Sequence, residues 1–323
     1  MRNRVIVTGG MGFIGRNLVK KLSNEGRKVI VLDNFSRSSV NQKFKSDIES
    51  VNVDFLSVDI LNFQDLNSIV FKGDTVYHLA AINGTKNFYN RPLEVLEVGA
   101  IGAINVAKIC LAKEARKLII FSSSEVYGTP DEYPTSEEIP YFLGSRKNPR
   151  YSYGIGKIVS EYVSSYISKE IPTAIIRPHN VYGPNMGYDH VIPELLIKLK
   201  KEIEQKKERI QVEVQGSGFE TRAYCYIDDF LKALDIVNNT SKSDEIFNIG
   251  SAEEISIFKL VQEMGQIINR EIVVTPNLQM KQEGSTDRRI PNIEKILELG
   301  YRQSVSLNEG LKHMIRNYIG INI

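Results

Sequence analysis

Tyr153 and Lys157, four positions apart in the stretch YSYGIGK, are a pair that can take a proton from an alcohol. In a helix this spacing places both side chains on the same face. A phenol with an ordinary pKa of about 10 is a poor base at neutral pH, but a lysine ammonium beside it favours the phenolate. We therefore predict that Tyr153 removes the proton of a hydroxyl group while the hydrogen on the same carbon leaves as hydride.

A second group of reactive side chains follows the apolar run KLIIF, in the stretch SSSEVYG at residues 122–128. Ser123 or Ser124 can hydrogen-bond the hydroxyl on which Tyr153 acts. Glu125 is harder to explain, because a carboxylate near the end of a buried strand costs free energy unless it has a partner or a chemical role. Two interpretations stay open: Glu125 is a catalytic base, or it is structural and caps a helix or pairs with an arginine.

A hydride needs an acceptor, and the stretch VTGGMGFIG near the N-terminus is typical of a turn that binds a dinucleotide. Gly9 permits the tight turn, Gly12 leaves room for a pyrophosphate beside the backbone, and Gly15 lets the following helix pack closely. Asp33 ends the next strand-like run and can hydrogen-bond both hydroxyls of an adenosine ribose, which favours NAD over NADP. Arg37 nearby keeps NADP open as the alternative.

The elements that must position these groups alternate along the first half of the chain. Strand-like apolar runs lie at 4–10, 28–34, 51–60, 74–81 and 117–124, and helical stretches such as EVGAIGAINVAKICLAKEA separate them. Strands that alternate with helices predict a parallel sheet buried on both faces. We predict an α/β fold with a doubly wound, Rossmann-type sheet over residues 1–175. A smaller α/β substrate lobe over 176–323 is expected to send segments back to the main domain.

Composition places the chain among ordinary globular proteins. Its 323 residues are 42% hydrophobic and 25% charged with a net charge of +2, so we expect neither nucleic acid nor a membrane surface as a partner. Cys110 and Cys225 show no metal or redox spacing, so we expect two buried thiols and no metal site. No apolar run approaches the roughly 20 residues of a membrane span. The N-terminus has no signal-peptide pattern, so the cytoplasm is the expected location.

Several of these motifs occur together in one known family. The chain resembles the extended short-chain dehydrogenase/reductases of the NAD-dependent epimerase/dehydratase family, which modify nucleotide sugars. The resemblance rests on TGGMGFIG, LDN, VDI at 58–60, HLAA at 78–81, SSSEVYG, YSYGIGK, RPHNVYGP, TRAYCYIDD and DRRIPNI. It implies tightly held NAD and a nucleotide-diphosphate sugar as substrate. The residues expected at the cofactor are Gly9, Gly12, Phe13, Ile14, Gly15, Asp33, Asn34, Asp59, Ile60, Leu79, Ala80, Ala81, Lys86, Tyr153 and Lys157.

The resemblance also assigns residues to the substrate. Asn180 in RPHNVYGP is implied at the sugar or the diphosphate. Arg222 and Arg289 are implied at the diphosphate, whose oxygens match the planar fork of guanidinium donors. One position departs from the family: Gly99 stands where the family usually has Asn, so a side-chain contact behind the nicotinamide is in doubt, while Asn105 remains a match.

The family further implies a homodimer. The helix that starts near Tyr151 and the helix in EVLEVGAIGAINVAKICLA carry more apolar surface than one face of a sheet needs. Paired across a two-fold axis, they would form a four-helix interface.

Oxidation at C4 of the sugar can lead to three reactions. The pattern SSSEVYG resembles the Thr-Ser-Glu of GDP-mannose-type 4,6-dehydratases, with Glu125 as the base at C5. It departs from the Asp-Glu pair of dTDP-glucose dehydratases, because Ser124 stands at the position of the aspartate. The same pattern, together with NPRYSYGIGK and Arg289, resembles UDP-glucuronate decarboxylases. A 4-epimerase needs Tyr153, a serine and room for the keto sugar to turn, but no further acid or base.

We place 4,6-dehydration first, 4-epimerisation close behind it and decarboxylation third. A protein that only senses NAD(P) is disfavoured, because such members of the superfamily typically lose the Tyr/Lys pair that this chain keeps.

Overall fold

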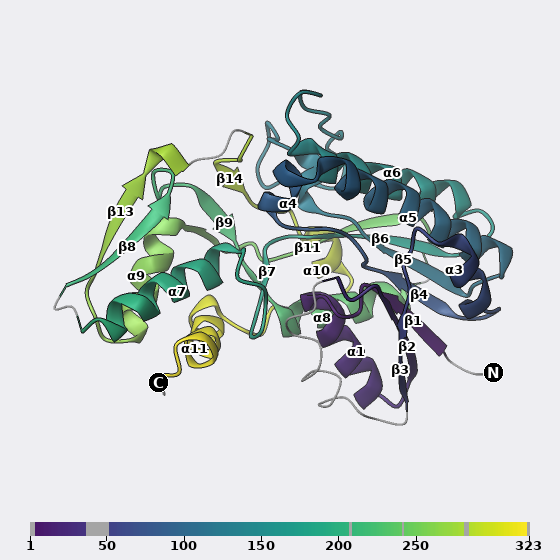
Figure 1. Ribbon diagram of the computed structural model, residues 1–323, viewed down its shortest axis with the longest axis horizontal. Helices are drawn as coiled ribbons and strands as arrows, with labels where there is room; N and C mark the ends of the chain where they lie inside the picture. The colour runs from purple at the N-terminus through teal and green to yellow at the C-terminus, as the bar shows by residue number, and fades with distance from the viewer. Residues whose placement is uncertain (1–3, 37–51, 207–208, 241, 281–283, 322–323) are drawn as a thin grey trace. The chain divides into compact units, whose positions relative to one another are not determined.

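The structure is a computed structural model that describes residues 4–36, 52–206, 209–240, 242–280 and 284–321 (Figure 1). Arg37, the residue that kept NADP open, lies outside the described residues. The chain divides into two compact units. Unit 1 comprises Met1–Val126, Tyr141–Arg177 and Asp235–Phe247, and unit 2 comprises Tyr127–Pro140, Pro178–Leu234 and Asn248–Ile323.

A seven-stranded sheet organises unit 1. Its order is β11-β6-β5-β4-β1-β2-β3, and the strands from β6 to β3 pair in parallel. The strands are β1 (Arg4–Thr8), β2 (Lys28–Asp33), β3 (Val53–Ser57), β4 (Thr75–His78), β5 (Lys117–Phe121), β6 (Thr173–Pro178) and β11 (Glu245–Ile249). The strand order reverses direction between β1 and β4, as in doubly wound dinucleotide-binding folds. The predicted fold class is therefore confirmed.

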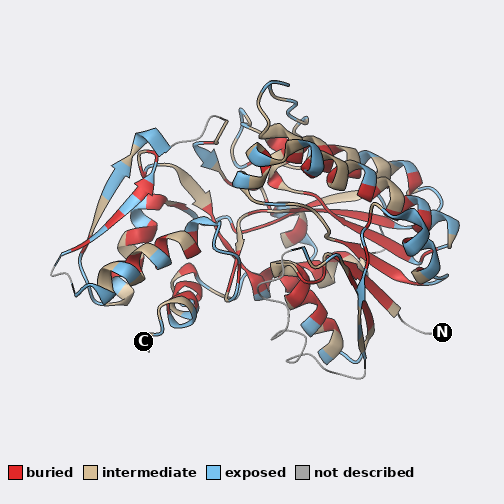
Figure 2. Cartoon of the chain, viewed as in Figure 1, coloured by how far each residue is buried: buried red, intermediate tan, exposed pale blue. Residues whose placement is uncertain are grey.

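Helices cover both faces of this sheet, with α1 on one face and α3, α5 and α6 on the other (Figure 1). The helices are α1 (Phe13–Asn24), α3 (Phe63–Ile69), the short α4 (Thr85–Asn90), α5 (Pro92–Ala112) and α6 (Tyr151–Ile167). Because both faces are covered, the central strands are buried over almost their whole length, as Figure 2 shows. This explains why they read as continuous apolar runs rather than as alternating ones.

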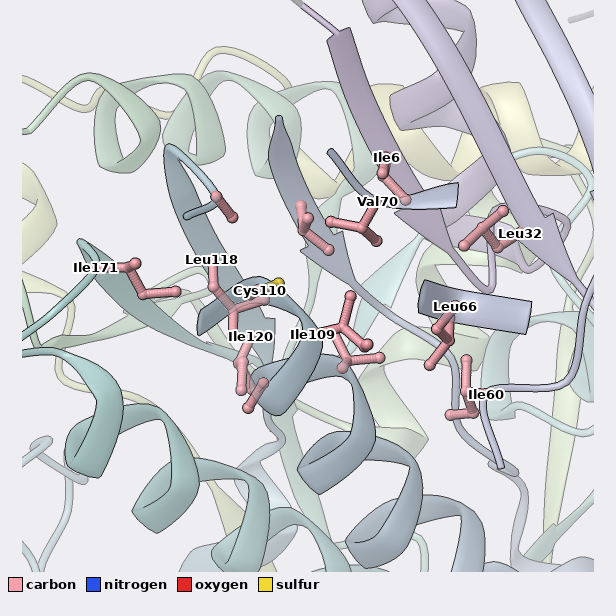
Figure 3. Close-up of a cluster of buried hydrophobic side chains, with 14 of the residues drawn as sticks. Ile6, Leu32, Ile60, Leu66, Val70, Ile109, Cys110, Leu118, Ile120 and Ile171 are labelled. Atoms are coloured by element: carbon pink, nitrogen blue, oxygen red, sulfur yellow. The ribbon is translucent and has the colours of Figure 1, made fainter. Parts of the chain in front are cut away.

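One hydrophobic cluster fills the layer between the sheet and the helices α3 and α5 (Figure 3). Ile6 and Leu118 come from strands, Leu66 from α3 and Ile109 from α5. Each such side chain contributes about 1.5–3 kcal/mol when it is fully buried. The cluster fixes α3 and α5 against the sheet whose strand ends carry the reactive residues.

Two glycines face each other where α5 packs against α6. A Cβ atom on Gly99 would lie 3.1 Å from the Cα of Gly156, and a Cβ on Gly156 would lie 3.1 Å from the Cα of Gly99. A side chain at either position would push one backbone against the other. The Gly99 departure from the family pattern therefore has a physical basis, because α5 and α6 approach closely beside Lys157.

Unit 2 is built from short elements around three small sheets, with the strand orders β12-β9-β14, β13-β8 and β10-β7. Its strands are β7 (Val181–Tyr182), β8 (Ile210–Gln215), β9 (Thr221–Ala223), β10 (Cys225–Tyr226), β12 (Glu254–Ser256), β13 (Ile272–Asn277) and β14 (Arg288–Arg289). Its helices are α7 (Val191–Glu204), α9 (Ile257–Ile267), the single turn η3 (Leu278–Met280), α10 (Glu294–Glu298) and α11 (Leu307–Tyr318), while α8 (Ile227–Asn239) contributes to both units.

The segment 127–140 belongs to unit 2 although it precedes residue 175. Its backbone explains this: the Thr135 N–H donates to the Ile290 carbonyl at 2.8 Å, and the Asn292 N–H donates to the Thr135 carbonyl at 2.8 Å. These long-range bonds leave no local mark in the sequence, so a single boundary at 175 does not describe the observed units.

Helix α5 corrects one expectation. It spans 21 residues and is apolar enough to cross a membrane by length and composition alone, contrary to the sequence prediction. Burial inside the structure accounts for part of this apolar character, since 44% of its most apolar window is buried. The prediction of two buried thiols is confirmed, and burial raises the pKa of both Cys110 and Cys225 to about 12.

Candidate active site

The glycine-rich turn joins β1 to α1 and packs against the end of β4. Gly9 has a φ of 66°, and a Cβ there would lie 2.7 Å from the backbone N of Ala80. A Cβ on Gly15 would lie 2.4 Å from the Gly9 carbonyl oxygen, so both positions require glycine.

Gly12 is the N-cap of α1, and no side chain caps that helix end. A Cβ on Gly12 would meet nothing closer than the Gly9 carbonyl at 3.3 Å. The first amides of α1, at Phe13 and Ile14, therefore begin a helix whose positive end suits a phosphate. The turn fits the pyrophosphate of a dinucleotide.

Acidic residues follow β2 and β3 at the same edge of the sheet. The Asp33 carboxylate accepts hydrogen bonds from the Met11 N–H at 3.0 Å and the Phe35 N–H at 2.9 Å, which fixes it beside the glycine turn. A carboxylate offers about four acceptor positions, so it can also accept from ribose hydroxyls. Asn34 lies 3.5 Å from Asp59, so the residues expected at the adenosine come together here.

Two residues that sequence reasoning left unassigned organise this edge. The Asn105 carboxamide donates to the carbonyls of Ile60 and Leu61, each at 3.1 Å, and so holds the loop after β3. The Thr8 hydroxyl accepts from the Ala80 N–H at 3.2 Å and lies 2.8 Å from His78 Nδ1. Burial, together with the charge of Lys157, lowers the pKa of His78 to about 3.

These bonds position the stretch HLAA. The Leu79 N–H donates to the Thr8 carbonyl at 3.1 Å. Leu79, Ala80 and Ala81 directly follow β4, so this bond holds them beside the start of the glycine turn. Lys86, the remaining residue expected at the cofactor, lies on the short helix α4.

Tyr153 and Lys157 lie in the first two turns of α6, as the spacing predicts. The Lys157 Nζ donates to the Phe121 carbonyl at 2.7 Å and lies 5.7 Å from the centre of the Tyr153 ring. Burial lowers the pKa of Lys157 to about 8, and the Glu161 carboxylate acts in the opposite direction. The Tyr153 ring stacks on Phe88, with 4.8 Å between ring centres. The structure thus brings the Lys157 ammonium close to the Tyr153 ring.

Ser123, Ser124 and Glu125 follow β5 and lead into the 3-10 turn η2 (Ser124–Tyr127). The Glu125 N–H donates to the Ser123 Oγ at 3.2 Å, so the turn is held by its own side chain. A Cβ on Gly154 would lie 3.2 Å from the Glu125 carbonyl oxygen, which shows how closely α6 packs on this turn. The serines and the Tyr/Lys pair are thus presented by two elements in contact.

Glu125 has an ionic partner. One Nη of Arg150 lies 3.2 Å and 3.3 Å from the two carboxylate oxygens, and both side chains are largely buried. The sequence left pairing with an arginine as one of two interpretations, and Arg150 stands in the quoted motif NPRYSYGIGK. The structure therefore brings together the charged residues of two motifs that are 25 residues apart.

The residues expected at the substrate belong to unit 2. Arg222 and Arg289 are register partners in the parallel pair β9–β14. The Arg222 guanidinium donates to the carbonyls of Thr221 at 2.7 Å, Asp287 at 3.2 Å and Thr286 at 2.9 Å, which fixes its plane.

Two further observations concern the same small sheet. The Asn180 carboxamide donates to the Ala223 carbonyl at 3.0 Å and so lies against the end of β9. Arg288 instead forms an ion pair with Glu254 at 2.8 Å. Within the part of the chain that the structure describes, no three His, Cys, Asp or Glu side chains gather as a metal site.

Comparisons with known proteins agree with this geometry. The family model described as "NAD dependent epimerase/dehydratase family" matches residues 5–250. A UDP-N-acetyl-alpha-D-glucosaminuronate decarboxylase of Bacillus cytotoxicus is 31% identical over 98% of both chains. A protein of Methanocaldococcus jannaschii described as a putative UDP-glucose 4-epimerase is 30% identical over 96% of this chain and 97% of its own. The crystal structure of a UDP-glucuronic acid 4-epimerase from Bacillus cereus, in complex with UDP-glucuronic acid and NAD, superposes with a TM-score of 0.83. It is 26% identical over 98% of this chain and 99% of its own.

Proposed function

The chain belongs to the NAD dependent epimerase/dehydratase family, and on that premise we propose that it decarboxylates a nucleotide-linked uronic acid. The cofactor of the family is NAD, and the glycine turn and Asp33 are the residues that would hold it. The substrate class is a nucleoside-diphosphate hexuronate, such as UDP-glucuronate or its N-acetylated amino analogue.

The ion pair between Glu125 and Arg150 carries this proposal. Each residue stands in a motif that resembles decarboxylases, and the pair joins the two motifs. The relative from Bacillus cytotoxicus, described as a decarboxylase, supports the same reading over nearly the whole chain.

Decarboxylation needs NAD, Tyr153, Lys157 and a proton from solvent. NAD, when bound, takes the C4 hydride and later returns it. The Tyr153 phenolate takes the proton of the C4 hydroxyl, and the Lys157 ammonium stabilises that phenolate. The C6 carboxylate is then β to a ketone, so the C5–C6 bond breaks, carbon dioxide leaves, and the electron pair moves to the C4 oxygen. A solvent-derived proton adds at C5, and Tyr153 returns its proton to O4 as the ketone is reduced. None of these steps needs a base at C5.

Dehydration makes different demands. Loss of the C6 hydroxyl requires a base at C5 and an acid that protonates the leaving oxygen. Glu125, the residue expected as the base at C5, is engaged by Arg150. We therefore rank 4,6-dehydration, the first choice on sequence, behind decarboxylation.

A 4-epimerase is the second candidate, because it needs no catalytic role for Glu125. If Arg150 only holds Glu125 in place, the remaining residues, Tyr153, Lys157 and a serine, suffice for oxidation and for reduction from the other face. The relative from Methanocaldococcus jannaschii supports this alternative.

The test is turnover in deuterated water without added cofactor. UDP-glucuronate and UDP-N-acetylglucosaminuronate are supplied separately, and we expect carbon dioxide in equal amount to a pentose product that carries deuterium at C5. A uronate product inverted at C4 without deuterium would overturn the proposal in favour of epimerisation. A 4-keto-6-deoxy product from dTDP-glucose or GDP-mannose would overturn it in favour of dehydration.

A matched pair of arginine variants tests the ion pair itself. Arg150→Met removes the partner of Glu125, whereas Arg146→Met changes an exposed arginine of the same loop. A charge-assisted hydrogen bond is worth about 1.5–3 kcal/mol, so we expect kcat to fall about ten- to a hundredfold in the first variant. Equal rates for both variants would show that the ion pair does not contribute to turnover.

Substrate binding and assembly complete the proposal. We assign the diphosphate to Arg222 and Arg289 and the sugar or diphosphate to Asn180, and we place the enzyme in the cytoplasm. We also propose a homodimer through α5 and α6, which expose Leu93, Ile101, Tyr162 and Tyr166. Light scattering at micromolar concentration tests the dimer, and a monomer there would contradict it.

A further inference from the structure

A charged side chain that the proposed chemistry does not use lies one helical turn beyond Lys157. Glu161 is on α6, and only 1% of its side chain is exposed. A carboxylate that is removed from water costs free energy unless it is paired and hydrogen-bonded. Its partners come from three other segments, which makes it a junction between elements rather than a local contact.

The carboxylate is bonded on both oxygens. Arg177 of β6 donates from Nε to one oxygen at 3.0 Å and from Nη2 to the other at 2.7 Å. The Tyr141 hydroxyl donates at 2.9 Å, and the Ser122 hydroxyl donates to the oxygen that Nε also contacts. A bidentate guanidinium pair of this kind fixes orientation as well as charge.

Ser122 connects this junction to the catalytic lysine. It follows Phe121, whose carbonyl accepts the hydrogen bond from the Lys157 Nζ at 2.7 Å. It precedes the hydroxyls of Ser123 and Ser124. Glu161 therefore ties the end of β5, which the serines follow, to α6, which carries Tyr153 and Lys157.

We propose that Glu161 is a positioning residue for Lys157 and Tyr153, which ties the end of β5 at Phe121 and Ser122 to α6. The inference rests on the proposed function only through the Tyr/Lys chemistry, which all three candidate reactions share.

The charged and titratable groups near Lys157 determine how Glu161 affects its pKa. Glu161 is the negative group near it, and it opposes the lowering of the Lys157 pKa by burial. From β4, His78 faces it as a neutral imidazole, because its pKa is about 3. From β6, Arg177 adds a positive charge that Glu161 balances. At this level α5 presents Gly99 and the backbone of Ala100, neither of which is charged.

The sign of the expected change follows from these charges. Glu161→Gln keeps the shape of the side chain but removes the negative charge that opposes the effect of burial on Lys157. The loss disfavours the ammonium form, so we expect the pKa of Lys157 to fall below about 8.

The test titrates Lys157 directly in the NAD-loaded enzyme. Lysine is labelled with ¹³C at Cε, and the Lys157 resonance is assigned by its loss in Lys157→Met. We expect the midpoint to fall by on the order of one pH unit in Glu161→Gln. Asp74→Asn is the matched control, because it breaks another largely buried ion pair of the same unit, with Arg4. A folded Glu161→Gln protein with an unchanged midpoint, or an equal shift in Asp74→Asn, would overturn the proposal.

A milder variant covers the case in which Glu161→Gln does not fold. Ser122→Ala keeps the ion pair and the bond from the Ser122 N–H to the Ile176 carbonyl, and loses only the hydroxyl bond that joins the residue after Phe121 to Glu161. Misplacement of reacting groups lowers rates steeply, so we expect kcat to fall at least about threefold with KM unchanged, on whichever nucleotide sugar is turned over. An unchanged kcat would refute the positioning role. The lysine titration needs no turnover, so it stands apart from any failure of decarboxylation.

Discussion

The energetic importance of the close approach of α5 and α6 can be measured by replacing Gly99 of α5 and Gly156 of α6 with alanine. Alanine in a helix interior is more favourable than glycine by about 0.5–1 kcal/mol. Against this, the new Cβ at position 99 would lie 3.1 Å from the Cα of Gly156, whereas carbon atoms prefer about 3.5–4.0 Å. The helices must therefore separate, and strain from overpacking typically costs about 1–3 kcal/mol. After the helix-propensity gain is subtracted from the strain, we expect a net destabilisation of about 1 kcal/mol for Gly99→Ala and a similar one for Gly156→Ala.

The double variant is more informative. Two Cβ atoms would then face each other across a gap that accommodates neither, so the loss should exceed the sum of the single losses, as expected for residues in contact. Urea denaturation of the NAD-loaded protein measures each free energy of unfolding. Gly187→Ala is the control, because a Cβ there meets nothing within 4 Å. Single variants as stable as the wild type, with an additive double variant, would refute the reasoning.

Three further predictions follow from the site and its supports. Tyr153→Phe should lower kcat by about 10²–10⁴-fold, the usual cost of losing a general base, while NAD absorbance shows the cofactor still bound; a smaller loss would assign the base elsewhere. Lys157 is cationic below its pKa of about 8, so kcat should decline as pH rises through about 8; a pH profile that is flat to pH 10 would contradict this. Lys117→Met should destabilise the protein by about 1–3 kcal/mol, because the buried ammonium donates to the Val237 and Asn238 carbonyls at 3.0 Å and 2.9 Å at the end of α8; thermal denaturation measures it, with exposed Lys108→Met as the control.

The sequence was sufficient for the fold class because the relevant signals are local. Apolar runs of strand length alternate with helical stretches, and the glycine turn joins the first strand to the first helix, so the doubly wound sheet could be predicted without any contact. The Tyr153/Lys157 pair was equally accessible, since a spacing of four on a helix determines a shared face. The expectation that no apolar segment has membrane length failed at α5, because Glu94, Glu97 and Lys108 interrupt the apolar run while the helix as a whole stays apolar.

The roles of Glu125 and Glu161 depended on residues that only folding brings near. The sequence alone determined that a carboxylate follows the serines of SSSEVYG, but not that Arg150 meets it. It gave no sign that Ser122, Tyr141 and Arg177 converge on Glu161, because those residues come from three segments and share no spacing. The boundary at 175 missed the 127–140 segment for the same reason, since its backbone bonds reach residues 290–292. Spacing along the chain specifies which side chains share an element, whereas the packing of elements determines which charges become partners, and those partners govern the electrostatics of the site.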